Sequence, residues 1–178
     1  MSIGIITDVI KNCTTSTTSR PNAELVERQN RKKPAALQKV KVEKLPQGSV
    51  WFSVDNKKEW SPYLKDTPKI NKRCDYVILS KVDEVVHLIF VELKSGSVSD
   101  DISEKFKSTE CFMDYCESIC KRLFAMPFLK TAQKRFVVFA KGAEQKTPTR
   151  FNGVLHDQPE TPKLIINPNR VKFKQLIR

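Results

Sequence analysis

Glu92 and Lys94 stand near the end of the segment VVHLIFVELKSG (85–96), whose residue types point to chemistry. Seven of its first nine residues are apolar, which predicts a strand buried on both faces. Because side chains alternate along a strand, Glu92 and Lys94 point to one face and Leu93 to the other. Burying a lone charge there is very unfavourable. We therefore expect a metal ion or an anionic substrate to compensate both charges.

Asp75 precedes the other half of the same predicted hairpin. The segment CDYVILSK (74–81) reads as a strand and VDEV (82–85) as a turn. Antiparallel pairing around that turn makes facing residue numbers sum to about 167, which places Asp75 opposite Glu92. Two adjacent carboxylates repel each other unless a cation bridges them. Oxygen ligands select hard ions, so Mg²⁺ or Mn²⁺ is expected rather than zinc.

The series Asp75, apolar hairpin, Glu92-Leu93-Lys94 resembles the active-site signature of the PD-(D/E)XK nucleases, the restriction-endonuclease-like superfamily. The resemblance covers roughly residues 22–140. It implies an α/β fold with a restriction-endonuclease-like core, in which helices flank a central mixed β-sheet. It also implies that Asp75, Glu92 and the Leu93 carbonyl bind the metal. Lys94 would orient and help to deprotonate the attacking water, and Asp75, Glu92 and Lys94 would be the catalytic set.

Members of this family often add an acidic ligand from the first helix, and Glu24 or Glu27 would fill that place. The chain also departs from the family pattern. Cys74 stands where proline often precedes the aspartate, and Cys111 stands where one branch has Gln four residues before Tyr115. The alternative interpretation of Glu92 and Lys94 is an ion pair that caps the edge of a strand.

The charge of the chain favours an anionic partner. Its 178 residues carry 32 Lys and Arg against 20 Asp and Glu, a net charge of +12. A nucleic-acid backbone is the commonest partner for such an excess, although a merely basic protein would show it too. The expected nucleic-acid contacts are Lys32, Lys33, Lys107 and Thr109, with a solvated face as the alternative. The aromatic residues Trp51, Phe52 and Trp60 are interpreted as core rather than as base-stacking groups.

Elsewhere the patterns predict one mixed α/β domain, residues 22–178, behind an N-terminal segment and linker, residues 1–21. His87, on the strand face opposite Glu92, is expected to be a partly buried structural residue. Five cysteines without a paired spacing indicate a reducing, intracellular (cytoplasmic) setting, and no run is long enough to span a membrane. The predicted helices are at 2–12, from Asn22 through AELVERQN, and from Ser99 or Asp100 to before Pro127. In the last of these, apolar residues from Ile102 to Leu123 recur every three or four positions, and charged residues, Lys105 among them, are assigned to the opposite, solvent-facing side. A linker is predicted at 14–21, and strands are predicted at 49–55, 74–81, 85–94, 135–140, KLIIN and VKFKQLI.

The sequence thus predicts a Mg²⁺- or Mn²⁺-dependent nuclease, specifically a DNA endonuclease that hydrolyses phosphodiester bonds with a metal-activated water. Two alternatives stay open. One is a non-catalytic nucleic-acid-binding subunit that keeps the fold within a larger nucleoprotein complex. The other is a nuclease that cleaves RNA. A homodimer is also compatible with the sequence.

Overall fold

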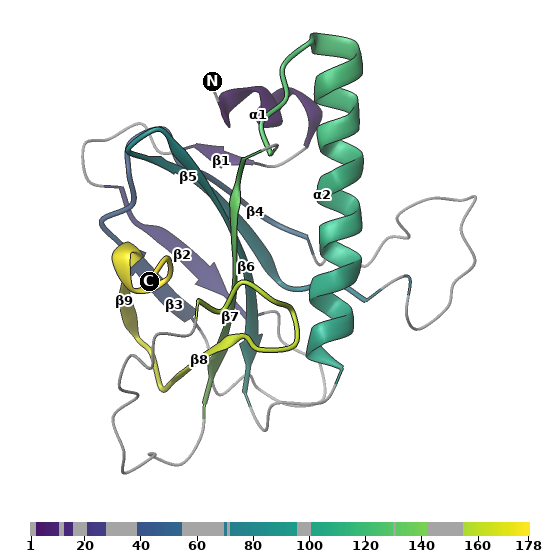
Figure 1. The fold of residues 1–178 in the computed structure, drawn as a ribbon. Helices are drawn as coiled ribbons and strands as arrows, with labels where there is room; N and C mark the ends of the chain where they lie inside the picture. The colour runs from purple at the N-terminus through teal and green to yellow at the C-terminus, as the bar shows by residue number, and fades with distance from the viewer. Residues whose placement is uncertain are drawn as a thin grey trace.

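The computed structural model describes residues 3–10, 13–15, 21–27, 39–54, 70, 72–95, 101–129, 131–141 and 155–178. These residues form a mixed α/β fold with two sheets (Figure 1). The larger sheet has the order β1-β4-β5-β6-β7-β8, with β1 (Thr14–Thr15), β4 (Val50–Ser53), β5 (Tyr76–Val82), β6 (Val85–Lys94), β7 (Gln133–Ala140) and β8 (Lys163–Ile166). The smaller sheet has the order β2-β3-β9, with β2 (Ala23–Val26), β3 (Lys39–Glu43) and β9 (Arg170–Lys172). The helical elements are η1 (Ile3–Ile5), α1 (Ile6–Val9), α2 (Ile102–Phe124) and η2 (Phe173–Gln175).

The hairpin β5–β6 forms as the sequence predicts. Tyr76 faces Val91, so the facing residue numbers sum to 167 along the whole ladder. The turn residues Asp83 and Glu84 have φ angles of 46° and 66°. Positive φ at both central positions suits a two-residue connection, because it matches the twist of the flanking strands. The turn therefore sets the register that ends with Tyr76 opposite Val91, immediately next to Asp75 and Glu92.

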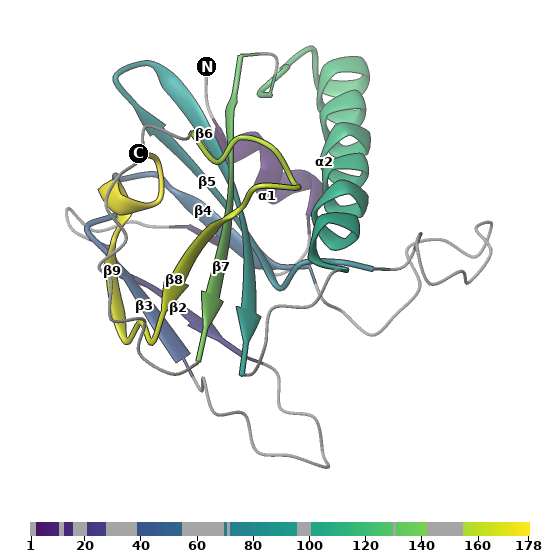
Figure 2. The ribbon, with the colours of Figure 1, turned by 60° about the horizontal axis from the view of Figure 1, so that its bottom comes forward.

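Helix α2 lies along one face of the larger sheet and connects β6 to the parallel strand β7 (Figures 1 and 2). Its predicted apolar stripe is buried from Ile102 to Cys120. Leu123, which the pattern also places on the stripe, is 74% exposed. The buried stripe therefore ends at Cys120, before the last turn of the helix. The predicted caps Ser99 and Asp100 lie outside the described residues, and the helix starts after Asp101.

The opposite face of the larger sheet is covered by the β2-β3-β9 sheet, which the sequence did not predict. The segment expected to be a helix from Asn22 is a strand, and its side chains alternate between buried and exposed. Ala23 and Leu25 are buried against the larger sheet, while Glu24 and Val26 face outward. An apolar pattern this short does not distinguish a helix from a strand, and pairing with β3 stabilises the strand. The larger sheet is the mixed sheet that was expected, but a second sheet, and not helices, covers its other face.

The N-terminal segment belongs to the same fold. The helical stretch expected at residues 2–12 is present as η1 and α1, and Ile3 and Ile6 are buried in the core beneath α2. Thr14 and Thr15, expected in a linker, form strand β1 against β4. At the other end of the chain, β8 forms as predicted, whereas the second expected strand is only the short β9 followed by η2. Within the described ranges, no helix is long and apolar enough to cross a membrane.

His87 points away from α2 into the core between the two sheets. It is 6% exposed, and the Phe173 ring contacts it edge-on at a centroid distance of 6.4 Å. Among the described residues, its Nδ1 atom has no hydrogen-bond partner. Burial, with a smaller contribution from the nearby Arg135 guanidinium, lowers the pKa of His87. The neutral ring is thus the form that the fold accommodates, in keeping with the predicted structural role.

We predict that His87 makes the protein less stable in mild acid. The unfolded chain protonates this histidine near its ordinary pKa, about 6.5, while the folded protein resists protonation. Unfolding therefore takes up a proton between the two pKa values, and the free energy of unfolding falls as the pH drops through that range. Urea denaturation at about pH 7.5 and about pH 5.5 should show a smaller acid loss for His87→Phe than for the wild type. Equal losses in both proteins would contradict this role.

Candidate active site

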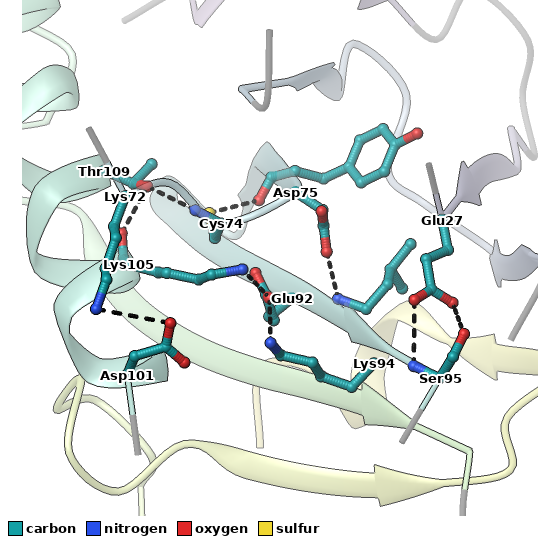
Figure 3. A network of polar contacts seen from close by, with 12 residues as sticks. Glu27, Lys72, Cys74, Asp75, Glu92, Lys94, Ser95, Asp101, Lys105 and Thr109 are labelled. Atoms are coloured by element: carbon teal, nitrogen blue, oxygen red, sulfur yellow. Dashed lines mark hydrogen bonds and ion pairs between the residues drawn. The ribbon is translucent and has the colours of Figure 1, made fainter. Parts of the chain in front are cut away.

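The structure brings Asp75, Glu92 and Lys94 to one corner of the larger sheet (Figure 3). Asp75 lies just before β5, and its backbone N–H donates to the carbonyl of Val91, the residue that faces Tyr76, at 3.0 Å. Its carboxylate Oδ2 accepts a hydrogen bond of 2.6 Å from the Leu93 N–H. The aspartate is thereby tied to the main chain of the Glu92-Leu93-Lys94 segment.

Glu92 is the buried charge of this corner, with only 1% of the residue exposed. Its Oε1 atom accepts from two ammonium groups, Lys94 at 3.3 Å and Lys105 at 2.5 Å (Figure 3). Its Oε2 atom is buried and has no hydrogen-bond partner among the described residues. Burial raises the pKa of Glu92, although the two lysines act in the opposite direction. One oxygen of the carboxylate is thus paired with two ammonium groups, and the other has no hydrogen-bond donor among the described residues.

Lys105 is the site residue that sequence reasoning missed. It comes from the first turn of α2, where the charged positions were assigned to the solvent face. Burial disfavours its ammonium form, but Glu92 raises its pKa, and the net direction is upward. A signal was present in the spacing: Lys105 lies four residues before Thr109, which lies four before Met113, so all three are on one face of the helix. The lysine extends the buried stripe into the corner of the sheet.

Thr109 joins α2 to the strand that carries Asp75. Its Oγ1 atom accepts from the Cys74 N–H at 3.0 Å and donates to the Lys105 carbonyl at 2.8 Å. The residue is fully buried, so the expected contact between its hydroxyl and a phosphate is not available in this arrangement. Thr109 instead positions Cys74, which precedes Asp75, and Lys105, which contacts Glu92.

We predict that Thr109→Val lowers the free energy of unfolding by about 1–3 kcal/mol, because it leaves the buried Cys74 N–H without an acceptor. Thr109→Ser keeps the hydroxyl and should retain most of that stability. Urea denaturation of the three proteins measures the difference. A valine variant as stable as the serine variant would mean that this hydrogen bond does not hold the strand to the helix.

The two candidate acidic ligands differ in position. Both are near strand β2 rather than on a helix, which corrects the expected element. Glu24 is exposed on the outer face of the small sheet and pairs with Lys39 at 3.3 Å. Glu27 accepts from the Ser95 N–H at 3.2 Å and from the Ser95 hydroxyl, one residue beyond Lys94 (Figure 3). Of the two, Glu27 is the one at the rim of the site.

The other predicted contacts are only partly described. Lys107 is on the exposed side of α2 and pairs with Glu160 at 2.5 Å. Phe52 is buried in the core, and Trp51 packs against the apolar residues that lie between the two sheets, as the core interpretation expects. Lys32, Lys33 and Trp60 lie outside the described residues.

The donor set of the corner fits a hard divalent cation. Mg²⁺ in proteins commonly uses one or two carboxylates and keeps several waters. Within the described part of the chain there is no cluster of three or more His, Cys, Asp or Glu side chains that could hold a metal. The oxygen donors at the corner are the Asp75 and Glu92 carboxylates and the Leu93 carbonyl, which are the groups that would hold such an ion. The Glu92 oxygen without a hydrogen-bond partner is the observation that fits a cation here.

Comparisons with known proteins were made for the whole chain. No protein-family model, curated protein or solved structure matches it. What the protein does must therefore be inferred from its own residues and their arrangement.

Proposed function

We propose that the protein is a metal-dependent nuclease of the PD-(D/E)XK type, acting on DNA as an endonuclease. One observation carries the proposal. Two carboxylates and a lysine meet at the end of a buried strand, and the Glu92 carboxylate is 1% exposed with one oxygen lacking a hydrogen-bond partner among the described residues. Lysines already offset the charge of Glu92, but a buried oxygen without a donor is unfavourable, and a bound cation would satisfy it.

In this proposal Asp75, Glu92 and the Leu93 carbonyl hold the ion. A bound divalent cation would supply positive charge to the scissile phosphate and lower the pKa of a water molecule. Lys94 holds its ammonium beside Glu92 at 3.3 Å, where it orients the attacking water and stabilises negative charge on the phosphate. The Leu93 N–H bond to Asp75 keeps the two acidic groups in register. No covalent intermediate with the chain is required.

The charge of the chain supports a nucleic-acid substrate. A net charge of +12 favours association with a phosphate backbone without selecting a base sequence. All five cysteines are free thiols, which fits an intracellular setting in which such a substrate is present. We expect the substrate to be DNA, and the substrate panel described below also tests RNA.

The rival proposal is a nucleic-acid-binding subunit that does not cut. The observation in its favour is that two lysine ammonium groups, from Lys94 and Lys105, pair with Glu92. Metal binding separates the two proposals. A nuclease site should raise the melting temperature when Mg²⁺ or Mn²⁺ is added, and Asp75→Ala should abolish that rise.

The proposal is tested with a panel of substrates. Wild-type protein is incubated with supercoiled plasmid, labelled single-stranded DNA and labelled RNA, each in Mg²⁺, in Mn²⁺ and in EDTA. Cutting of DNA that requires the metal supports the endonuclease, and cutting of RNA alone would change the substrate class. Binding of nucleic acid without any cutting favours the non-catalytic subunit.

A further inference from the structure

Glu92 has one more ammonium partner than its single charge requires. Lys94 and Lys105 both contact Oε1, and the helix-borne Lys105 is the closer, at 2.5 Å against 3.3 Å (Figure 3). The proposed reaction already assigns a role to Lys94, which belongs to the Glu92-Leu93-Lys94 segment. Lys105 comes from a different element, and the proposed reaction gives it no role.

Lys105 is placed between the acidic groups of the corner. Glu92 is its direct partner, and the Asp75 and Asp101 carboxylates are also near enough to raise the pKa of its amine. Only 22% of its side chain is exposed. An ammonium group that contacts Glu92, in the corner that also holds Asp75, offsets the repulsion between the two carboxylates, as a bound divalent cation would.

The neighbouring contacts hold the helix backbone but leave the lysine tip able to move. The Lys105 carbonyl accepts from Thr109, and its N–H donates to the Asp101 carbonyl at 3.2 Å, so the backbone is held in the first turn of α2. The ammonium itself is carried on a four-carbon stem with several rotatable bonds. The tip can therefore leave Glu92 without any change in the helix.

We propose that Lys105 is a positioning residue that takes the place of the divalent cation in the metal-free protein and competes with it for Glu92. The inference rests on the proposed function. Lys105 contacts Glu92 and holds its carboxylate in place while no metal is bound. A divalent cation repels the ammonium, and Lys105 withdraws from Oε1 as the ion binds.

The test measures the affinity of the intact chain for Mn²⁺ by isothermal titration calorimetry. Lys105→Gln removes the competing charge and should bind Mn²⁺ about tenfold more tightly than the wild type, the effect of one unit charge a few ångströms from a carboxylate. Lys105→Arg keeps the charge and should bind as the wild type does. Lys107→Gln makes the same change two residues along the helix, on a side chain paired with Glu160, and should also leave the affinity unchanged.

Unchanged or weaker Mn²⁺ binding by a folded Lys105→Gln protein would overturn the competition while leaving the proposed nuclease intact. A folded wild-type protein that binds no Mn²⁺ would overturn the proposed function, and the competition with it. The two failures are therefore distinguishable.

A second measurement needs no variant, in case Lys105→Gln does not fold. Acetylation of the wild-type lysines is followed by mass spectrometry with and without Mg²⁺. Lys105 should react faster when Mg²⁺ is present, because its amine leaves Glu92, whereas Lys107 should react at the same rate in both. Equal reactivity of Lys105 in both conditions would show that it does not move aside for the metal.

Discussion

Glu92→Gln should reduce metal-dependent cleavage by about 10³-fold or more, because the several kcal/mol that a bound metal contributes to the transition state would be lost. The amide has almost the shape of the carboxylate but carries no charge. It therefore cannot attract a divalent cation into the corner, and it offers the Lys94 and Lys105 ammonium groups a weaker partner. The loss should lie mainly in the turnover rate rather than in nucleic-acid affinity, which depends on charges spread over the surface.

The measurement is single-turnover cleavage of labelled DNA at saturating Mg²⁺, with circular dichroism to confirm that the variant is folded. Glu84→Gln is the matched control. Glu84→Gln makes the same carboxylate-to-amide change at the other end of the hairpin, where the Glu84 side chain is 88% exposed. It should cleave as the wild type does. A Glu92→Gln protein that still cleaves at the wild-type rate would remove Glu92 from the site.

Phe136→Ala should lower the free energy of unfolding by about 3–5 kcal/mol, the usual loss for truncating a buried aromatic side chain. Phe136 is fully buried on β7, stacked on Phe90 at a centroid distance of 4.9 Å and tilted against Phe106 at 5.1 Å. Its ring therefore joins the strand that carries Glu92 to the helix that carries Lys105. No other single contact described above connects both of these elements through the core.

Urea denaturation of wild type and Phe136→Ala measures this loss. Phe124→Ala serves as control, since Phe124 is 45% exposed at the end of α2 and its truncation should change stability by less than about 1 kcal/mol. Similar losses in the two variants would mean that the aromatic cluster is not the main packing contact between β6, β7 and α2.

The part of the site that follows from local pattern could be predicted from the sequence. The turn at Asp83 and Glu84 connects two apolar runs, so counting across it predicts facing numbers that sum to about 167, and the paired residues have that register as far as Tyr76 and Val91, next to Asp75 and Glu92. Alternation along β6 puts Glu92 on the face that α2 covers. Both results depend only on the period of two in a strand and on a short turn.

The parts that depend on contacts between distant segments could not be predicted. AELV (23–26) is too short for its period to separate a strand from a helix, and pairing with β3 decides the outcome. Lys105 was assigned to solvent because a lysine on an amphipathic helix usually belongs there. Its role becomes visible only when the helix is placed on the sheet and a buried carboxylate lies beside its tip.

The central claim is that this corner hydrolyses phosphodiester bonds with a divalent cation and Lys94. The most direct test is nicking and linearisation of supercoiled plasmid by wild type, Lys94→Ala and Lys81→Ala, each in Mg²⁺ and in EDTA. Lys81 pairs with Glu84 at the far end of the hairpin, so its loss controls for the removal of one positive charge. We predict cutting by wild type and Lys81→Ala in Mg²⁺ only, and none by Lys94→Ala. Cutting that persists in EDTA, or that survives Lys94→Ala unchanged, would contradict the claim.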